Sequence, residues 1–392
     1  MRTVAWLFAM PLLAVSAPQP PPQLSTRLHT ILQQYVRDRG TKENITAASL
    51  SVSLKQGDPP ILVAAGTMGH ANSRRITQST LFQIGSNTKA FTSALILQLE
   101  SEGRLSISDR VGKWLPQYPA WKNVTIHQLL DMTSGITTYD NTPAFQRDYS
   151  ANPKRNFSRR ELIAYAYPKT GKATFHKGWY YSNTGYILAE MIAEKAAHKP
   201  YPELLQTRLF QPAGLKNAYY DAHMLPTLLH ARLLSGYFAS NDPDNAGLSK
   251  LYGTDVRDYS LSWAQGAGGI VATPADVSQW ARALYTGDVL PAKQRAEMMT
   301  LVSNKTGRPI PGVSAEDPMG FGLGIAEIYD PALGKFWFYQ GETLGYRVLH
   351  VWFPGNDVVL TVGVNSQPNE KENHLQAFVK SIVAALRNAR VF

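Results

Sequence analysis

The sequence contains no cysteine among its 392 residues. This absence excludes disulfide bonds, metal sites built on thiolates and lipid anchors attached to a cysteine. The nine histidines show no His-x-x-x-His pair or other spacing typical of metal ligands. We therefore expect a protein that needs neither a metal nor a cofactor.

Long apolar runs are also absent after the first residues of the chain, so the sequence predicts no integral membrane span. Residues 1–16 combine a basic Arg2, an apolar stretch over 4–15 and the small-x-small sequence Ala14-Val15-Ser16. This pattern is typical of a secretory signal peptide that is cleaved after Ser16. For an exported protein without cysteine, we expect a periplasmic location.

Clustered charge is missing as well. The 39 Lys and Arg residues exceed the 29 Asp and Glu residues and give a net charge of +10, but they are scattered along the chain. A nucleic-acid-binding protein gathers its basic residues on one face or stripe. We expect a small-molecule or peptide substrate and no nucleic acid, and the sequence indicates no particular oligomeric state.

The patterns that are present predict an α+β fold. Alternating and β-branched runs predict five strands, and amphipathic patterns predict a helix near each end of the mature chain. The expected strands are 48–54, 61–65, 335–339, 346–353 and 358–364, and the terminal helices are 24–40 and 371–388. We expect a five-stranded antiparallel sheet flanked by the terminal helices, with an inserted, mostly helical subdomain.

The expected division of the chain follows from these elements. After the signal peptide, a proline-rich spacer occupies 17–23, where the prolines favour a stiff and exposed segment. An α/β sheet subdomain combines 24–105 with 318–392, and the helical subdomain spans 106–317.

A serine and a lysine lie one helical turn apart in Ser86-Asn87-Thr88-Lys89, where a short apolar run meets a turn and a long buried helix begins. Residues at i and i+3 are neighbours on a helix surface, so Lys89 can reach the Oγ of Ser86. The N-terminal end of a helix also favours negative charge at this serine. The pattern predicts a serine nucleophile with an amine base, although a chain of this length also contains such a pair by chance.

Two further segments carry polar residues where they could face a cleft. Tyr181 and Asn183 lie on a loop that leads into a helix, and they would supply a proton-transfer group and a fixed amide. The segment Tyr339-Gln340-Gly341-Glu342 lies at the end of an expected strand, where a glycine lets the backbone approach a ligand closely. Each segment also has a structural interpretation, the first as an aromatic helix start and the second as a turn between strands.

Taken together, these segments resemble the serine β-lactamase and penicillin-binding-protein superfamily, closest to its class C β-lactamase-like branch of DD-carboxypeptidases and carboxylesterases. That family carries Ser-x-x-Lys, Tyr-x-Asn and Lys/His-x-Gly in this order, which here fall at Ser86, Tyr181 and Tyr339. The stretches 129–136 and 268–273 look like the family as well. The resemblance covers nearly all of the mature chain and implies the β-lactamase/DD-peptidase-like fold.

The resemblance implies an acyl-enzyme mechanism. Ser86 would attack a carbonyl carbon, Lys89 and Tyr181 would share the proton transfers, and Asn183 would position the substrate or Lys89. For Lys89 to act as the base at neutral pH, its pKa has to fall by about 3 units from the ordinary value. Otherwise Tyr181 has to be the base, and the sequence leaves both alternatives open.

The third motif would form a substrate-binding strand. By resemblance, the backbone N–H groups of Ser86 and Glu342 would form an oxyanion hole, and Tyr339 and Gly341 would contact the substrate. Tyr339 departs from the family, which usually has Lys or His there, and the lost cation weakens recognition of a free carboxylate. The sequence Lys305-Thr306-Gly307 looks like the same motif but lies in a proline-flanked loop, so we do not expect it in the site.

These observations predict an exported serine hydrolase that cleaves an amide or an ester through an acyl-enzyme on Ser86, with D-amino-acid peptide or β-lactam-like substrates. The alternative, favoured by Tyr339, is a β-lactamase-like carboxylesterase. A third interpretation is a catalytically silent module that binds peptidoglycan or penicillin. The intact Ser86, Lys89, Tyr181 and Asn183 oppose it.

Overall fold

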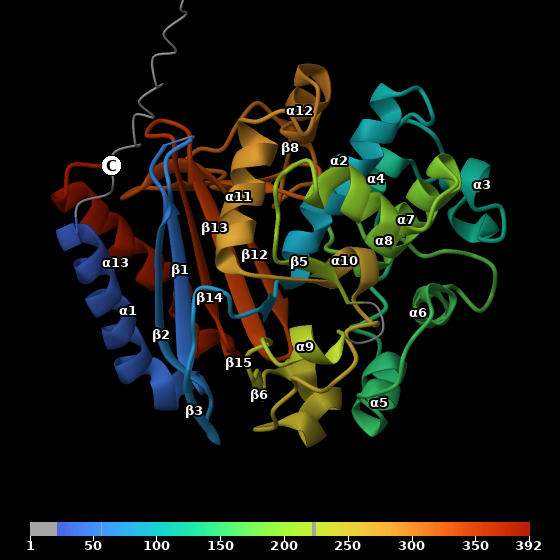
Figure 1. Ribbon diagram of the computed structural model, residues 1–392. Helices are drawn as coiled ribbons and strands as arrows, with labels where there is room; N and C mark the ends of the chain where they lie inside the picture. Colours follow the sequence, from blue (N-terminus) through green and yellow to red (C-terminus); the bar gives the residue numbers. More distant parts are fainter. Residues whose placement is uncertain (1–21, 56, 222–224) are drawn as a thin grey trace, which may run out of the picture.

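The computed structural model describes residues 22–392 except for 56 and 222–224 (Figure 1). The predicted signal peptide, 1–16, and the predicted spacer up to residue 21 lie outside the described residues. The first described helix, α1 (Pro22–Glu43), is longer than expected and extends three residues past Gly40. Leu24, Leu28 and Leu32 are buried at intervals of four residues, so one face of α1 packs on the core.

The largest element is an antiparallel sheet with the strand order β3-β2-β1-β14-β13-β12-β11-β10-β8-β9. Its strands are β1 (Ala47–Ser53), β2 (Ile61–Gly69), β3 (Asn72–Arg75), β8 (Leu301–Ser303), β9 (Pro309–Ile310), β10 (Met319–Phe321), β11 (Ala326–Asp330), β12 (Gly334–Thr343), β13 (Tyr346–Phe353) and β14 (Val358–Val364). The five expected strands are the adjacent strands β2, β1, β14, β13 and β12. The prediction of a five-stranded sheet is wrong, because the sheet has ten strands.

The additional strands lack the apolar alternation on which the prediction depended. β3 is an Asn-Ser-Arg-Arg segment with three exposed residues at one edge of the sheet. On the other side of the sheet, β8, β9 and β10 have only two or three residues each. Short or charged strands are typical of sheet edges, where they hinder pairing with other chains.

Helices cover both faces of the sheet (Figure 1). α1 packs on β1 and β2 and against α13 (Leu375–Asn388), whereas α11 (Pro274–Tyr285) packs on β1, β13 and β14 from the opposite face. All residues of β14 are buried, as expected for a central strand between two helical layers.

A second group of helices lies beside the sheet and surrounds α2 (Thr88–Ser101), which contacts α7 (Asn183–Ala197), α10 (Gln265–Gly268) and α12 (Ala292–Met298). The other helices are α3 (Val111–Trp114), α4 (Ile126–Leu130), α5 (Pro143–Ala151), α6 (Arg159–Ala166), α8 (Tyr201–Leu204) and α9 (Thr227–His230). Eleven of the 14 residues of α2 are buried, so the start of this helix is shielded from water.

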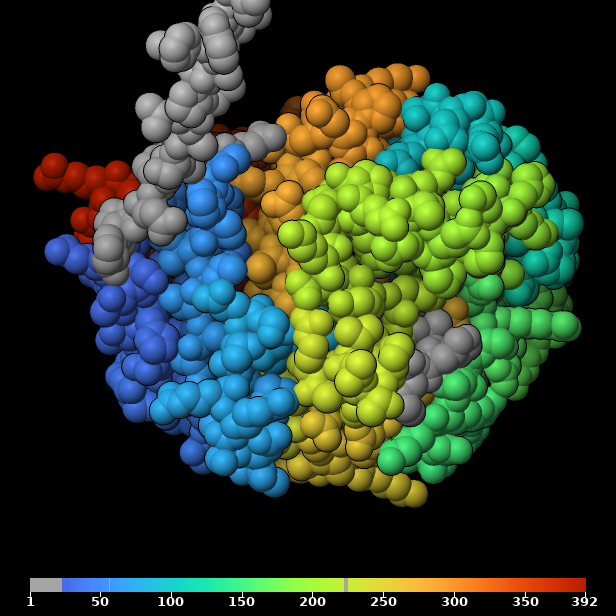
Figure 2. Space-filling view, viewed as in Figure 1, coloured from blue at the N-terminus to red at the C-terminus, as the bar shows by residue number. Residues whose placement is uncertain are grey.

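Two small sheets connect these parts. One contains β4 (Phe82–Gln83), β7 (Ile270–Ala272) and β5 (Ala218–Tyr220), and the other pairs β15 (Ser366–Pro368) with β6 (Tyr237–Ala239). In the space-filling view, the yellow-green residues of about 200–221 and 225–250 form the surface between the blue strands and the green helices (Figure 2). The predicted subdomain limits at residues 105 and 318 stay a prediction.

Across the described part of the chain, we find no helix with the length and apolarity needed to cross a bilayer. The same residues contain no group of three or more His, Asp or Glu side chains arranged to hold a metal ion.

Candidate active site

Ser86 lies in a tight 3₁₀ turn, Gly85–Asn87, that leads directly into α2. Gly85 has a φ of +50°, which favours glycine, and a Cβ at this position would lie 2.6 Å from the backbone nitrogen of Glu342. The turn therefore holds Ser86 at the N-terminus of α2 and directly against β12.

Lys89 lies one turn further along α2 and is fully buried. Its Nζ donates hydrogen bonds to the Oγ of Ser86 at 2.9 Å and to the backbone oxygen of Ala267 at 2.7 Å. Burial disfavours the charged amine and lowers the pKa of Lys89 to about 7, although the field of Asp140 acts in the opposite direction. Near neutral pH, a large fraction of Lys89 is thus uncharged and able to accept the proton of Ser86.

Tyr181 is the second side chain that contacts the Oγ of Ser86. Its hydroxyl donates a hydrogen bond to the Oγ of Ser86 at 2.6 Å, and its ring centroid lies 4.8 Å from the Nζ of Lys89. Burial raises the pKa of Tyr181 well above its ordinary value. The phenol therefore keeps its proton at neutral pH and is placed to donate it, whereas Lys89 is placed to accept one.

Asn183 is the first residue of α7 and lines the same cavity as Ser86. Its Nδ2 donates a hydrogen bond to Asp140 Oδ2 at 2.6 Å, and its backbone N–H donates to Thr138 Oγ1 at 3.0 Å. Thr138 in turn donates to the other carboxylate oxygen of Asp140 at 2.5 Å. The partner of the Asn183 amide is thus Asp140, and no hydrogen bond joins Asn183 to Lys89 among the described residues.

The β12 residues of the third motif lie beside the serine turn. A Cβ on Gly341 would lie 1.9 Å from the backbone oxygen of Ile84, so β12 and the turn are in direct backbone contact. The backbone of Glu342 also lies against Gly85, the residue before Ser86. The oxyanion hole expected from the N–H groups of Ser86 and Glu342 stays a prediction. The Tyr339 side chain is buried, and its pKa is raised well above the ordinary value by burial and by the nearby Tyr181.

A cavity of about 400 Å³ opens above these groups. It is lined by five site residues named above, Ser86, Tyr181, Asn183, Tyr339 and Glu342, and by aromatic side chains from several loops and strands, namely Tyr139, Phe145, Tyr149, Trp179, Trp263, Phe321 and Phe338. The structure thus brings together the predicted residues of all three motifs. Of the predicted site residues, Gly341 lies behind the cavity wall, where it supports the contact between β12 and the serine turn.

The Beta-lactamase family profile matches residues 32–384 of the sequence. The chain belongs to the beta-lactamase family. Its resemblance to the serine β-lactamase and penicillin-binding-protein superfamily is therefore confirmed.

One relative of this chain is Penicillin-binding protein 4* of Bacillus subtilis strain 168, which is 26% identical over 314 aligned residues. The alignment covers 79% of this chain and 65% of the relative. The Teichoic acid D-alanine hydrolase of Staphylococcus aureus strain MRSA252 is 28% identical over 205 residues, or 52% of the chain and 45% of the relative. The chain thus aligns with less than two thirds of the length of these two proteins.

Solved structures with the same fold include two amide hydrolases. The D-stereospecific amidohydrolase from a Streptomyces species has a TM-score of 0.68 at 25% identity, with 86% of this chain and 94% of that chain covered. The D-amino acid amidase from Ochrobactrum anthropi SV3 in complex with D-phenylalanine has a TM-score of 0.77 at 22% identity, with 94% and 99% covered.

The sequence did not indicate Asp140 or Ala267, both of which line the cavity beside Ser86. Ala267 contributes only its backbone oxygen, which no side-chain motif reveals. Asp140 lies in a loop 43 residues before its partner Asn183, and the sequence carries no signal that links the two.

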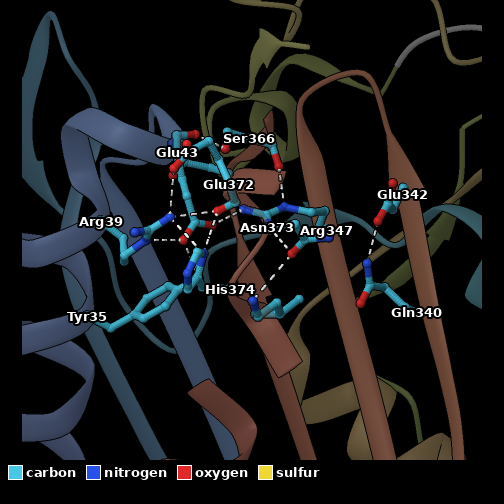
Figure 3. Close-up of polar contacts among 12 residues, drawn as sticks. Tyr35, Arg39, Glu43, Gln340, Glu342, Arg347, Ser366, Glu372, Asn373 and His374 are labelled. Carbon is cyan, nitrogen blue, oxygen red and sulfur yellow. Dashed lines mark hydrogen bonds and ion pairs between the residues drawn. The ribbon is translucent and has the colours of Figure 1, made fainter. Parts of the chain in front are cut away.

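Two basic residues that the sequence placed next to or in a motif-like segment lie outside the cavity lining. Arg347 follows the third motif but is fully buried, and in Figure 3 its side chain extends toward Glu43 of α1, away from Gln340 and Glu342. Lys305, in the look-alike sequence, donates a hydrogen bond to the backbone oxygen of Glu316 instead of facing Ser86.

Proposed function

We propose that this protein is an exported serine hydrolase that cleaves an amide or ester bond next to a D-amino acid through an acyl-enzyme on Ser86. The observation that carries the proposal is the position of the Ser86 Oγ, which lies 2.9 Å from the Nζ of Lys89 and 2.6 Å from the hydroxyl of Tyr181 at the wall of a large cavity.

The proposed reaction follows from the properties of these groups. Neutral Lys89 takes the proton of Ser86 while the Oγ attacks the substrate carbonyl, and the oxyanion is stabilised by the backbone N–H groups of Ser86 and Glu342. Tyr181, which is protonated at the start, donates its proton to the leaving group and takes up the proton that Lys89 received from Ser86. A water molecule then attacks the acyl-enzyme, with Lys89 again acting as the base, and Ser86 is restored.

The relatives support a D-amino-acid substrate. The names of two of them refer to D-alanine or to a D-amino acid, namely the teichoic acid D-alanine hydrolase and the D-amino acid amidase. A third is the D-stereospecific amidohydrolase. Export to the periplasm rests on the signal-peptide pattern of residues 1–16 and is checked by fractionation of cells that express the full chain.

A carboxylesterase is the second candidate. The observation that favours it is the buried Tyr339, which provides no cation for a substrate carboxylate at the position where the family usually has Lys or His. A catalytically silent binding module is disfavoured, because a protein without catalysis has no need for a lysine buried in contact with a serine hydroxyl.

Intact-protein mass spectrometry with parallel chromophore release tests the proposal. The protein is incubated with a D-aminoacyl p-nitroanilide, a p-nitrophenyl ester, a penicillin and a chromogenic cephalosporin. We expect turnover of the anilide and the ester, and Ser86→Ala abolishes both. Ester turnover without anilide turnover supports the esterase, and activity that survives Ser86→Ala overturns the proposal.

A further inference from the structure

The cavity beside Ser86 contains two carboxylates and no cationic wall residue. Asp140 and Glu342 line it, and no Lys, Arg or His side chain is part of the lining in the described chain. Asp140 accepts its hydrogen bonds from the neutral groups of Asn183 and Thr138, and Glu342 accepts one from Gln340. No salt bridge involves either carboxylate in the described chain, but Asp140 lies in the field of the buried Lys89 and Glu342 in that of Arg347. Burial also raises the pKa of Glu342, so Asp140 is the main acidic group that the cavity wall presents.

Several polar atoms of the cavity wall have no partner. The hydroxyl of Thr343 makes no hydrogen bond, although this residue is only 4% exposed. The side-chain oxygens of Asn183 and Gln367 are also buried without a donor. A buried acceptor without a donor is costly, and a ligand that brings N–H groups into the cavity would satisfy these oxygens.

Aromatic rings form the rest of the wall near Asp140. Phe145 and Tyr149 stack at 5.7 Å between ring centroids, and Trp263 lies 6.0 Å from Tyr149. Such rings provide apolar area for a large side chain, and their faces also attract a cation. The wall therefore fits a ligand that is both cationic and apolar.

We infer that the acyl group of the substrate carries a free ammonium group beside a bulky apolar side chain, and that Asp140 is the anchor for this ammonium. The substrate class is then an unblocked aminoacyl amide or ester. This inference rests on the proposed function, because it names which acyl group reaches Ser86. Substrates with a free carboxylate, such as penicillins and C-terminal D-alanyl peptides, meet repulsion from Asp140 and find no cation on the cavity wall.

Three matched substrates test the inference on the intact protein. D-Phenylalanine p-nitroanilide is cationic, its N-acetyl derivative is neutral and its N-succinyl derivative is anionic, whereas the scissile bond is the same. We expect kcat/KM to fall about 10- to 100-fold from the cationic to the neutral substrate, because a hydrogen bond to a charged group is lost. We expect a further fall for the anionic substrate.

Asp140→Asn removes the charge but keeps an oxygen that accepts hydrogen bonds from Thr138 or Asn183. We expect the ratio of kcat/KM for the cationic and neutral substrates to fall to within about threefold of one. Asp288→Asn is the matched control, because Asp288 is exposed and lies outside the cavity lining, and it leaves the ratio unchanged.

A measurement on the unmodified protein guards against misfolding of the Asp140 variant. 2-Phenylethylamine and 3-phenylpropionate have the same ring and opposite charges, and we expect the amine to be the stronger competitive inhibitor. Ser86-dependent turnover without preference for the cationic substrate, or stronger inhibition by the carboxylate, overturns the inference and leaves the proposed function intact. Absence of Ser86-dependent turnover of all three anilides and of the neutral ester overturns the proposed function, and the inference with it.

Discussion

The burial of Lys89 sets the pH at which Ser86 becomes reactive. Because the pKa of this lysine is lowered to about 7, the fraction of neutral amine falls about tenfold for each pH unit below that value. For a neutral p-nitrophenyl ester, we expect kcat/KM to rise by about two orders of magnitude from pH 5 to pH 7 and to level off above pH 8. Initial rates over pH 5–9 measure the profile, with Ser86→Ala as the background.

A rate that stays flat from pH 5 to pH 8 would contradict the assignment of Lys89 as the base. A rate that rises only above pH 9 would indicate that Lys89 keeps its ordinary pKa in solution.

The proposed role of Tyr181 depends on its hydroxyl group, which donates a hydrogen bond to Ser86. Tyr181→Phe keeps the ring that packs over the Nζ of Lys89 but removes the hydrogen bond to Ser86. We expect kcat to fall by about 10²- to 10³-fold, with a small change in the melting temperature, because proton transfer to the leaving group is impaired.

Tyr180→Phe provides the control for this substitution. Tyr180 stacks on His176 outside the cavity lining, so loss of its hydroxyl leaves kcat unchanged. Equal rates for Tyr181→Phe and the unmodified protein would exclude Tyr181 from the proton transfers.

Whether a contact of the site can be predicted from the sequence depends on how far apart its two residues lie along the chain. Ser86 and Lys89 are one helical turn apart, so helix geometry alone brings them together. Tyr181 contacts Ser86 from 95 residues away, and only the resemblance to a family linked the two motifs. The role of Asp140 depends on a loop conformation that no periodicity in the sequence encodes.

At the scale of elements, the backbone contact between β12 and the serine turn would set the geometry of the proposed oxyanion hole. In Gly341→Ala, the new methyl group would lie 1.9 Å from the backbone oxygen of Ile84, so strand and turn have to separate. We expect the free energy of unfolding to fall by about 1–3 kcal/mol and kcat to fall at least about 10²-fold as the N–H donors move apart. Thermal melting and ester turnover measure the two effects.

Gly355→Ala is the control for this prediction. Gly355 lies in the turn between β13 and β14, and a Cβ there meets no atom within 4 Å. We expect its melting temperature and kcat to match those of the unmodified protein. The prediction is wrong if Gly341→Ala behaves in the same way.

The elements that the sequence predicts well are those with a long periodic pattern. β13 and β14 have the expected bounds, because both are apolar runs on either side of a Pro-Gly-Asn-Asp turn. α5 mixes aromatic and polar residues and so has only a weak pattern in the sequence, and most of its packing is on the 3₁₀ helix Pro243–Leu251. β8 to β11 extend the sheet outward from β12, each through pairing with a neighbouring strand, and this pairing is tertiary information.

At the scale of the whole molecule, a buried ionic cluster joins α1 and the segment just before α13 to the centre of the sheet (Figure 3). Arg347 of β13 and Glu43 of α1 are both inaccessible to solvent, and they form a salt bridge at 2.7 Å. Arg347 also donates hydrogen bonds to the backbone oxygen of Ser366 and to Asn373, and Arg39 binds Glu43 and Glu372. The amphipathic patterns predicted both terminal helices but could not reveal this cluster.

Glu43→Gln leaves Arg347 buried without a compensating carboxylate, and a guanidinium cannot lose its proton to escape this cost. We expect the free energy of unfolding to fall by about 3–5 kcal/mol, as measured by urea denaturation.

Glu203→Gln is the control. It removes the carboxylate of an exposed i,i+4 pair with Lys199 and should change the free energy of unfolding by less than about 1 kcal/mol. In the double variant Glu43→Gln/Arg347→Met, part of the lost stability returns, because no unpaired charge remains in the core. If Glu43→Gln and Glu203→Gln were equally stable, the cluster would not hold α1 to the sheet, and the packing of Leu24, Leu28 and Leu32 alone would have to do so.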